Sequence, residues 1–383
     1  MNSPSVLNKK IGVLGGGQLG RMLIQSALNL NLDLHMLDPD AKAPCYKIAS
    51  GFTQGKLTDY DTVVSWGSQF DIITIEIENV NVEALEELER QGKQVYPQPH
   101  IIRLIQDKRT QKQFYQENDI PTAPFHLTET AAEVKQYADF LPAVHKLGKE
   151  GYDGRGVQMI RTSEDIGKAF DKPGLLEKMV PFEKEIAVIV ARNPSGEEVT
   201  YPPVEMVFHP EHNLVEFLLA PARLSVELSQ KAQALAKTVA QKLGIIGLLA
   251  VEMFVTSEGE ILVNEVAPRP HNSGHHTIEA NACSQYEQQL RAILDLPLGN
   301  TNTLVTAAMA NVLGEDGYTG EARYEGLDGV LKQENVFLHL YGKTQTKPFR
   351  KMGHVTIAAS SGESDHELLA RAEQIKNTLK VIA

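Results

Sequence analysis

Two glutamates near residue 250 are placed where they could bind a divalent cation. Residues 248–256 and 260–267 alternate apolar and other side chains, which is typical of strands, and the segment between them predicts a hairpin turn. If Glu258-Gly259 is a two-residue loop, Glu252 stands directly opposite Glu265 on the same face. Like charges so close repel, and a raised pKa, a basic neighbour or a hard cation must offset the repulsion. The pattern favours Mg²⁺ carrying ATP phosphates, although a one-residue error in the turn would separate the acids.

A glycine-rich loop at 148–156 has the composition of a phosphate-binding lid. Four glycines in nine residues let the backbone approach a ligand, and Lys149 and Arg155 supply positive charge. Residues 141–147 and 157–161 predict flanking strands, so a long flexible hairpin is the plainer interpretation. The loop is not a Walker A motif, because GxxxxGK[ST] is absent. We favour the lid.

A second glycine loop lies near the N-terminus. An apolar run at 11–14, the loop 15–20, a helical pattern at 21–30 and a second strand at 32–37 predict a βαβ unit. The loop matches GxGxxG, and Asp38 follows where a ribose-binding acid would lie, so the loop taken alone supports an NAD-dependent dehydrogenase. The same geometry serves any anion that binds backbone N–H groups at a helix N-terminus.

Two acids follow a third apolar run, at 72–77. Glu76 and Glu78 alternate with isoleucines and share one face by the period of a strand. Two interpretations stay open. The segment is either an edge strand with a solvated acidic face, or the end of a parallel strand, where open α/β sheets place their ligands.

Polar residues gather just after Glu265, in Pro268–His276. Two prolines stiffen this segment, and histidines stand at 271, 275 and 276. A zinc site is disfavoured because no cysteine or acid at ligand spacing completes the set. Contact with the substrate is favoured over a plain loop.

A basic loop lies between two predicted strands, 335–341 and 354–359. It contains Lys343, Lys347, Arg350 and Lys351, in a chain whose net charge is −12. It is either a solvated loop or a clamp on a second phosphate, distinct from those of ATP.

The elements that position these residues fit a protein of two or three domains. The chain has 383 residues and an ordinary globular composition, with 42% hydrophobic residues. Helices are predicted at 229–243, with Gly244 after its end, and at 365–379, where Ser364 and Glu367 fit a capping box.

Composition also excludes several classes of protein. The net negative charge argues against nucleic-acid binding, and the absence of 18 consecutive apolar residues argues against a membrane helix. The N-terminus lacks the pattern of a secretion signal, and Cys45 and Cys283 are expected to be buried thiols. We therefore expect a cytoplasmic protein.

Six motifs in order resemble one known family over essentially the whole chain. They are GGGQLGRM (15–22), IEIENV (75–80), DKRTQKQF (107–114), GYDGRG (151–156), NEVAPRPHNSGHHT (264–277) and YGK…RKMGH (341–354). Together they are similar to 5-(carboxyamino)imidazole ribonucleotide synthases. The resemblance implies an ATP-grasp fold of class α/β and α+β. Its parts would be an N-terminal Rossmann-like domain (1–107), a two-lobed ATP-binding domain (108–300) and a small C-terminal β-rich domain (301–383).

The resemblance also implies the reaction. ATP, bicarbonate and 5-aminoimidazole ribonucleotide would give ADP, phosphate and the N-carboxylated ribonucleotide through carboxyphosphate, with Mg²⁺, in purine biosynthesis. A homodimer is expected from the same likeness.

The family's nucleotide site carries over to a set of numbered residues. Lys108 and Lys146 would contact ATP phosphates, Glu185 would hold the ribose, and Glu252 and Glu265 would bind Mg²⁺. The remaining implied ATP contacts are Gly151, Tyr152, Asp153, Gly154, Arg155, Gly156 and Val157 of the lid, Glu177, Lys178, Met179 and Val180 around adenine, and Asn264.

The substrate side carries over in the same way. The implied contacts to aminoimidazole ribonucleotide are Gln18, Leu19, Glu76 and Asn272, with Lys343, Arg350 and Lys351 on its phosphate. Carboxyl transfer is expected to involve Tyr152, Asp153, Arg155, Arg269, His271, Asn272 and Lys351. Asp153 would accept the amine proton or orient Arg155.

Two positions depart from the family pattern, and three rival functions remain. Position 108 is Lys where many members have Arg, and Phe208 stands where several have a nucleotide-contacting His, so no role is assigned to Phe208 or His209.

The rivals are a formate-dependent glycinamide ribonucleotide transformylase, a dehydrogenase, and an ATP-binding regulator. The dehydrogenase leaves the glutamate hairpin unexplained.

Overall fold

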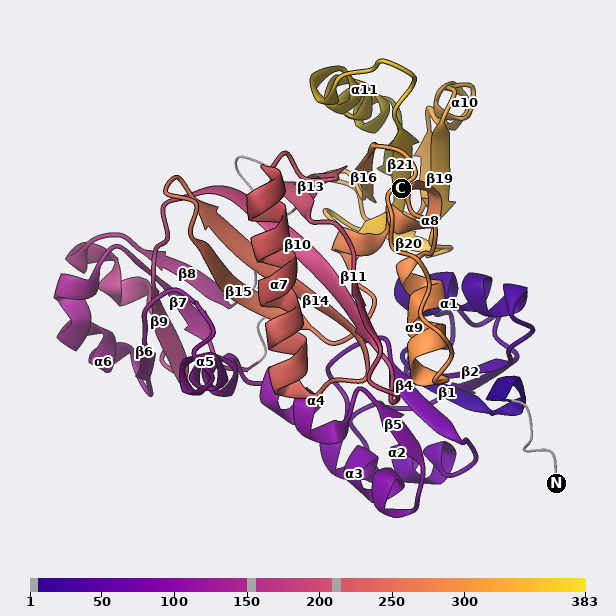
Figure 1. Ribbon diagram of the computed structural model, residues 1–383, viewed down its shortest axis with the longest axis horizontal. Helices are drawn as coiled ribbons and strands as arrows, with labels where there is room; N and C mark the ends of the chain where they lie inside the picture. The colour runs from indigo at the N-terminus through magenta and orange to yellow at the C-terminus, as the bar shows by residue number, and fades with distance from the viewer. Residues whose placement is uncertain (1–5, 150–155, 209–214) are drawn as a thin grey trace.

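The computed structural model of the protein describes residues 6–149, 156–208 and 215–383. Within these ranges there are three sheets of four or more strands, and Figure 1 shows a long helix, α7 (Val226–Leu243), in front of the central one. No helix in the described ranges has both the length and the apolarity needed to cross a bilayer. Cys45 and Cys283 are buried free thiols, as expected.

The N-terminal part is a parallel sheet covered on both faces. Strand order is β3-β2-β1-β4-β5. The strands are β1 (Ile11–Leu14), β2 (Leu34–Asp38), β3 (Gly51–Gln54), β4 (Ile72–Ile75) and β5 (Gln94–Tyr96). Helix α1 (Gln18–Asn29) packs on one face, and α2 (Tyr60–Gly67), α3 (Val82–Arg90) and α4 (Pro99–Ile105) pack on the other. The predicted βαβ unit is confirmed.

Strand β4 lies inside this sheet, between β1 and β5. The edge-strand interpretation of the acidic segment is therefore wrong. The strand also ends at Ile75, two residues earlier than predicted, so Glu76 and Glu78 lie beyond its carboxyl end. Strand order reverses between β1 and β4, which is where open α/β sheets bind ligands.

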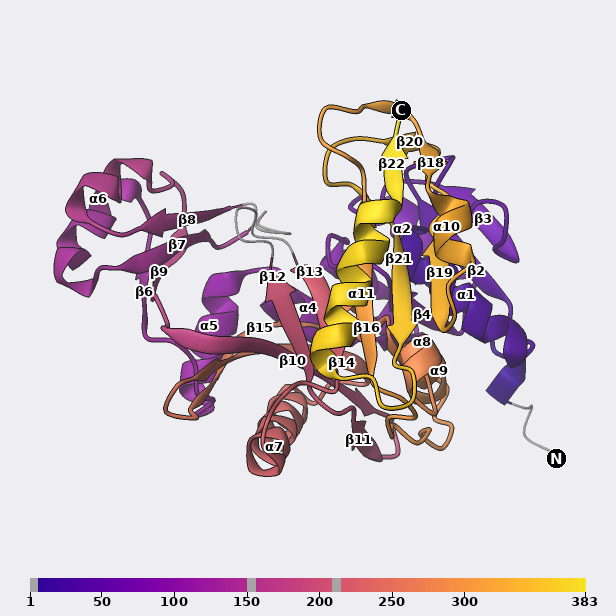
Figure 2. The same ribbon diagram turned by 90° about the horizontal axis from the view of Figure 1, so that it is seen from above.

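A four-stranded antiparallel sheet, in the order β6-β9-β7-β8, forms a separate lobe. Its strands are β6 (Phe125–Thr128), β7 (Ala143–Leu147), β8 (Val157–Ile160) and β9 (Gly174–Lys178). Short helices α6 (Ala131–Val134), η2 (Lys135–Phe140) and η3 (Ser163–Lys168) cover it. Figure 2 shows the lobe at one end of the molecule, with α5 (Lys108–Glu117) between it and the centre.

The central sheet has nine strands in the order β15-β14-β10-β12-β13-β16-β21-β19, with β11 paired to β10. They are β10 (Phe182–Arg192), β11 (Glu198–Thr200), β12 (Val204–Phe208), β13 (Val215–Ala220), β14 (Gly247–Thr256), β15 (Ile261–Ala267), β16 (Ala307–Leu313), β19 (Val336–Leu340) and β21 (Lys351–Ala358). Helix α7 buries its apolar side against β10 and β14. Ser225 caps its start, and Gly244, at φ 67°, ends it as predicted.

The C-terminal part extends the central sheet. Strand β16 pairs with β13, so three strands from beyond residue 300 continue a sheet that begins before it. The helices are α10 (Leu327–Leu331) and α11 (Asp365–Thr378), and the short strands are β17 (Gly320–Glu321), β18 (Arg323–Glu325), β20 (Gln345–Thr346) and β22 (Lys380–Ile382). The capping box of Ser364 and Glu367 is confirmed. The domain boundaries 1–107, 108–300 and 301–383 stay predictions.

Three helical segments lie between strands β15 and β16 of the central sheet. They are η4 (Asn272–Gly274), α8 (Thr277–Ala280) and α9 (Gln285–Ile293). Tyr286, Leu290 and Ile293 of α9 share one apolar core with α1. The segment that follows Glu265 is thereby fixed beside the N-terminal glycine loop.

Candidate functional site

The predicted pairing of the two glutamates is confirmed. Glu252 of β14 lies directly opposite Glu265 of β15. The Glu252 side chain is 15% exposed and that of Glu265 is 40% exposed, so a ligand can reach the pair from one side.

The predicted hairpin between the strands is confirmed, but its two-residue loop is wrong. The loop contains three residues, Ser257 to Gly259, because the Thr256 N–H donates to the Glu260 carbonyl and Gly259 takes the left-handed conformation, at φ 77°. That turn alone would place Glu252 opposite Asn264. A β-bulge inserts Asn264 into β15 and restores the opposition, so the predicted pairing arises by a different route.

Three lysines lie at the acid pair or beside it. Lys108, at the start of α5, forms an ion pair with Glu265. Lys146 of β7 donates to the bulged Asn264 at 3.0 Å and to Glu177 of β9 at 3.0 Å. Lys112, one turn after Lys108, lies 2.6 Å from the other Glu177 oxygen. Glu177 joins Lys112 to Lys146, and Lys146 reaches Asn264, the residue next to Glu265, where the small lobe meets the central sheet.

Charge is distributed unevenly over the carboxyl groups. Burial, then Glu265 and Glu185, raises the pKa of Glu252 well above its ordinary value, although Lys108 and Lys351 oppose the rise. The adjacent Lys108 lowers the pKa of Glu265 to about 2. Burial and the charge of Glu265 raise the pKa of Glu185 to about 7. Of these three carboxyls, Glu265 has a lowered pKa, whereas the ionised forms of Glu252 and Glu185 would be favoured by a cation.

These residues fit a hard divalent cation. Two facing carboxyls and the Asn264 amide beside them form an oxygen-rich set, as Mg²⁺ requires. Burial and the neighbouring carboxylates raise the pKa of Glu252 in spite of Lys108 and Lys351, so a further cation at this place would favour its ionised form. Lys108 and Lys146, which contact Glu265 and Asn264, supply the positive charge that binding of a polyphosphate requires.

The N-terminal glycine loop binds carboxylates of its own chain. The N–H of Gly17 donates to Glu76, as does that of Leu19 at 3.3 Å, and the N–H of Gly16 donates to Asp38 at 2.7 Å. A side chain at position 17 would place its Cβ 2.4 Å from the Glu76 carboxyl, so only glycine allows this approach. A dinucleotide pyrophosphate would have to displace both acids.

Glu76 lies just beyond the carboxyl end of β4, where open α/β sheets bind ligands. Burial raises its pKa to about 7, against the hydrogen bond from Gly17. Gln18 begins α1 beside it, and Leu19 is buried.

The segment after Glu265 brings its polar residues to the acid pair. His271 Nε2 lies 3.5 Å from Glu252, and its Nδ1 lies 2.9 Å from the Ser273 hydroxyl. Arg269 forms an ion pair with Glu78 at 2.8 Å. The buried Asn272 amide oxygen has no hydrogen-bond partner among the described residues, which is expected where a ligand supplies one.

His275 and His276 do not join this site. Both are buried, and His275 Nδ1 lies 3.0 Å from the Tyr286 hydroxyl. Burial lowers the pKa of both rings. They act as neutral packing groups beneath the segment.

The basic side chains of the C-terminal loop have different partners. Lys351 is the first residue of β21, and its charge opposes the rise in the pKa of Glu252 that burial and Glu265 cause. Lys343 donates to the Lys351 carbonyl at 2.6 Å. Arg350 donates to the Gln345 carbonyl at 2.6 Å within its own loop.

The segment expected around adenine runs from β9 toward β10. Its backbone is anchored by a hydrogen bond from the Met179 N–H to the Pro142 carbonyl at 3.2 Å, and Val180 accepts one from Phe182. The Lys178 ammonium points to the Phe140 carbonyl at 2.8 Å, and the Glu177 carboxylate is held between lysines. The adenine contacts expected here would therefore be backbone contacts.

Most of the lid lies outside the described residues. Gly151, Tyr152, Asp153, Gly154 and Arg155 belong to that part, as does His209. Gly156 accepts a hydrogen bond from Leu147 at 2.9 Å, and Val157 begins β8.

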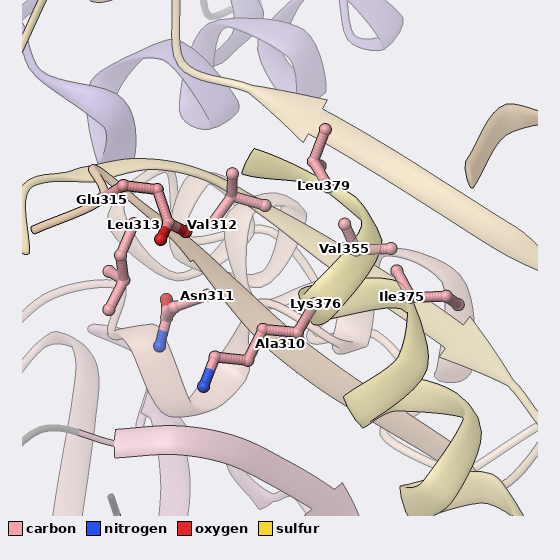
Figure 3. Close-up of a pocket in the computed structure, with 9 residues that line it drawn as sticks. All are labelled: Ala310, Asn311, Val312, Leu313, Glu315, Val355, Ile375, Lys376 and Leu379. Carbon is pink, nitrogen blue, oxygen red and sulfur yellow. The ribbon is translucent and has the colours of Figure 1, made fainter. Parts of the chain in front are cut away.

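A small pocket elsewhere in the molecule is unrelated to these residues. It lies under α11 in the C-terminal part, and Figure 3 shows the nine side chains that line it. Lys376 at its edge forms an ion pair with Glu216. None of the predicted site residues lines this pocket.

One charged residue beside the site, Lys112, is not among the residues expected from the sequence. It lies four residues after Lys108, on the same face of α5, and this spacing is a usable signal. Glu78 is expected as a candidate ligand-binding acid, but nothing local indicates that it pairs with Arg269 across 191 residues of chain.

The chain matches three family models in sequence. Residues 8–106 match the ribonucleotide synthetase preATP-grasp domain, residues 113–286 the ATP-grasp domain, and residues 307–368 the phosphoribosylaminoimidazole carboxylase C-terminal domain. The fold and site thus define an ATP-grasp protein.

Individual relatives show to which family of ATP-grasp proteins the chain belongs. The chain is 37% identical to N5-carboxyaminoimidazole ribonucleotide synthase of Synechococcus elongatus, over 96% of this chain and 93% of that one. A solved N5-carboxyaminoimidazole synthase of Aspergillus clavatus, in complex with ADP and 5-aminoimidazole ribonucleotide, is 33% identical with a TM-score of 0.88, covering 97% and 99% of the two chains. The chain belongs to the N5-carboxyaminoimidazole ribonucleotide synthase family.

A longer relative is similar over part of its length. The chain is 39% identical over 376 residues to the phosphoribosylaminoimidazole carboxylase of Candida albicans, covering 92% of this chain and 64% of that protein. The remaining third of the longer protein has no counterpart in this similarity.

Proposed function

We propose that the protein carboxylates 5-aminoimidazole ribonucleotide on its exocyclic amine, consuming ATP and bicarbonate and releasing ADP and phosphate. The observation that carries this proposal is the acid pair Glu252–Glu265, flanked by Lys108 and Lys146. Its family membership supports the choice of substrate, because the relative from Aspergillus clavatus was solved with that ribonucleotide.

In the first step, a bicarbonate oxygen attacks the γ-phosphorus of ATP. The bond to the leaving ADP oxygen breaks, and carboxyphosphate forms. Lys108 and Lys146 neutralise charge on the phosphoryl oxygens, which is the main requirement of phosphoryl transfer. Mg²⁺ held by Glu252 and Glu265 would add further neutralisation across the phosphates.

In the second step, the substrate amine attacks the carboxyphosphate carbon, phosphate leaves and the nitrogen loses a proton. His271 lies 3.5 Å from Glu252 of the acid pair, and Arg269 is paired with Glu78 in the same segment of chain. Both side chains would bind the carboxyl oxygens. Carboxyphosphate hydrolyses readily, so we expect the lid residues Tyr152, Asp153 and Arg155 to exclude water.

The ribonucleotide is proposed to lie between the glycine loop and the C-terminal loop. Gln18 and Glu76 would contact its ribose and base, and Lys343, Arg350 and Lys351 its phosphate. This division supports two anionic sites on opposite sides of the acid pair. A homodimer and a cytoplasmic location remain part of the proposal.

The rival functions are less well supported. The formate-using transformylase shares the nucleotide site but is not the family that the relatives indicate. The dehydrogenase requires a pyrophosphate on amides that Glu76 and Asp38 already bind.

The test is ADP release with alternative acceptors. Purified protein with ATP, Mg²⁺ and bicarbonate should form ADP in proportion to added aminoimidazole ribonucleotide. Glycinamide ribonucleotide with formate should give no more than background. Micromolar NADH binding by calorimetry, or equal turnover with both acceptors, would contradict the proposal.

A further inference from the structure

Lys112 occupies an unusual place for a lysine. Its side chain is 4% exposed, under the site rather than in it, on the face of α5 that also carries Lys108. A buried ammonium is costly unless it is paired and hydrogen-bonded. Two partners meet this need: the Glu177 carboxylate at 2.6 Å and the Thr122 hydroxyl. Each of them leads to the acid pair.

The first route runs through Glu177. This carboxylate is 3% exposed and lies between Lys112 and Lys146, which it meets at 3.0 Å. Lys146 in turn donates to Asn264. Because Glu177 is shared, Lys112 takes up part of its charge. Without Lys112 the whole carboxylate would attract Lys146 and hold it away from a phosphate.

The second route runs through Thr122. Its hydroxyl accepts from Lys112 and donates to the Val263 carbonyl at 2.6 Å, while the Val263 N–H donates to the Pro121 carbonyl at 2.7 Å. Val263 immediately precedes the bulged Asn264. Both backbone polar groups of Val263 are thereby fixed just before the bulge that restores the opposition of the glutamates.

We infer that Lys112 is a positioning residue of the nucleotide site, acting through Glu177 on Lys146 and through Thr122 on the β15 bulge. The part of this inference that concerns the KM for ATP during turnover rests on the proposed function. The predicted effect on MgATP binding does not depend on which substrate is carboxylated. Lys112 itself is too buried to touch a nucleotide.

The surrounding charges support this role. Burial lowers the pKa of Lys112 to about 8, and Lys146 and Lys108 act in the same direction, whereas Glu177 opposes them. Glu177 stays ionised, because the two lysines outweigh the effect of burial and lower its pKa. The ammonium also lies 5.9 Å from the centre of the buried Tyr115 ring.

The experiment compares Lys112→Met and Lys112→Arg with a matched lysine, Lys184→Met. Lys184 also pairs with a buried glutamate, Glu205 at 3.3 Å, but on a strand position away from the acid pair. Steady-state kinetics are measured with ATP, bicarbonate and aminoimidazole ribonucleotide varied in turn. MgATP binding to each full-length variant is measured by calorimetry.

We expect Lys112→Met to raise the KM for ATP and the Kd for MgATP about 10- to 100-fold, the range for residues that orient ligand-binding groups. The KM for the ribonucleotide should stay within about twofold, a split that general loss of structure would not produce. Lys112→Arg, which keeps the charge, should recover most of the loss. Lys184→Met should match the wild type.

Thr122→Val provides a second variant, in case Lys112→Met does not fold. It removes the second route alone and should weaken MgATP in the same direction by a smaller factor. The inference is overturned if Lys112→Met binds MgATP within twofold of wild type, or if both KM values rise equally. If instead the wild type binds MgATP but does not turn over the ribonucleotide, the proposed function fails and the calorimetric comparison still tests Lys112.

Discussion

Glu265 is the member of the acid pair that stays ionised, because Lys108 lowers its pKa to about 2. Burial and the charge of Glu265 raise the pKa of its partner, Glu252. This difference within one pair is consistent with the proposed cation site, because a bound cation would favour the ionised form of Glu252.

We predict that Glu265→Gln lowers ADP formation by at least about 100-fold with the fold intact, because the amide removes the permanent carboxylate of the metal pair. The measurement is ADP release at saturating Mg²⁺, with far-ultraviolet circular dichroism to check folding. Glu258→Gln, in the exposed hairpin turn, is the control. Activity of Glu265→Gln within about threefold of wild type, roughly 0.65 kcal/mol of barrier, would refute the metal assignment.

Glu76 should make stability depend on pH. Its pKa is raised from 4.5 to about 7 in the folded protein. Between these values the folded state binds more protons than the unfolded state, so stability falls as pH rises through that window and levels off above it. Glu76→Gln cannot titrate and keeps an acceptor for the glycine-loop amides.

We therefore expect the stability of Glu76→Gln relative to wild type to increase from about pH 4.5 to 7 and then stay constant. Urea unfolding at several pH values measures this difference. Glu183→Gln, at an exposed position of β10, is the matched control. Parallel profiles for wild type and Glu76→Gln would show that Glu76 does not titrate in this range.

At the scale of elements, the β14–β15 hairpin shows how a bulge creates a site. A regular continuation from its three-residue turn would set Asn264 against Glu252 and turn Glu265 to the other face. The bulge places Asn264 and Glu265 together, one against Lys146 and the other against Lys108. An irregular strand is therefore part of the proposed nucleotide site.

The C-terminal loop and the small lobe should bind different phosphates. We predict that Lys351→Ala raises the KM for aminoimidazole ribonucleotide about 10- to 150-fold, equivalent to losing a charged contact of about 1.5–3 kcal/mol. The KM for ATP should change little. Lys146→Ala should show the reverse.

Steady-state kinetics with each substrate varied in turn distinguishes these outcomes. Lys347→Ala, an exposed lysine of the same loop, is the control and should resemble wild type. A rise in the KM for ATP alone in Lys351→Ala would assign the C-terminal loop to the nucleotide site instead.

At the scale of the whole molecule, two side-chain amides join the N-terminal sheet to the central sheet. Gln289 accepts from the Leu248 N–H at 2.8 Å and donates to the Thr74 hydroxyl at 3.2 Å. Gln98 accepts from the Ile246 N–H at 3.0 Å and donates to the Gly244 carbonyl at 2.8 Å. These contacts keep the glycine loop in register with the acid pair.

We predict that Gln289→Leu destabilises the protein by about 1–3 kcal/mol, because it leaves the buried Leu248 N–H without an acceptor. Gln241→Leu, which removes an exposed contact to Glu198, should change stability by no more than about 0.5 kcal/mol. Urea unfolding of both variants provides the comparison. Equal effects would mean that the interface is not held by this amide.

Local features of the sequence determined the parts whose contacts are close along the chain. The βαβ unit, the glycine end of α7 and the capping box of α11 each depend on residues within one or two turns. The alternation of β14 and β15 likewise placed Glu252 on one face without knowledge of the rest of the fold. Six ordered motifs then indicated the family before any geometry was available.

Tertiary structure alone decided how these parts meet. Only the register of β14 against β15 identifies Asn264 as a bulge, because the alternation of side chains in a sequence cannot show an inserted residue. Lys112 and Glu177, and Arg269 and Glu78, pair across long stretches of chain. Glu76 turns to the glycine loop because β4 lies beside β1 in the sheet. Such contacts depend on which surfaces the fold brings together, and no local pattern encodes them.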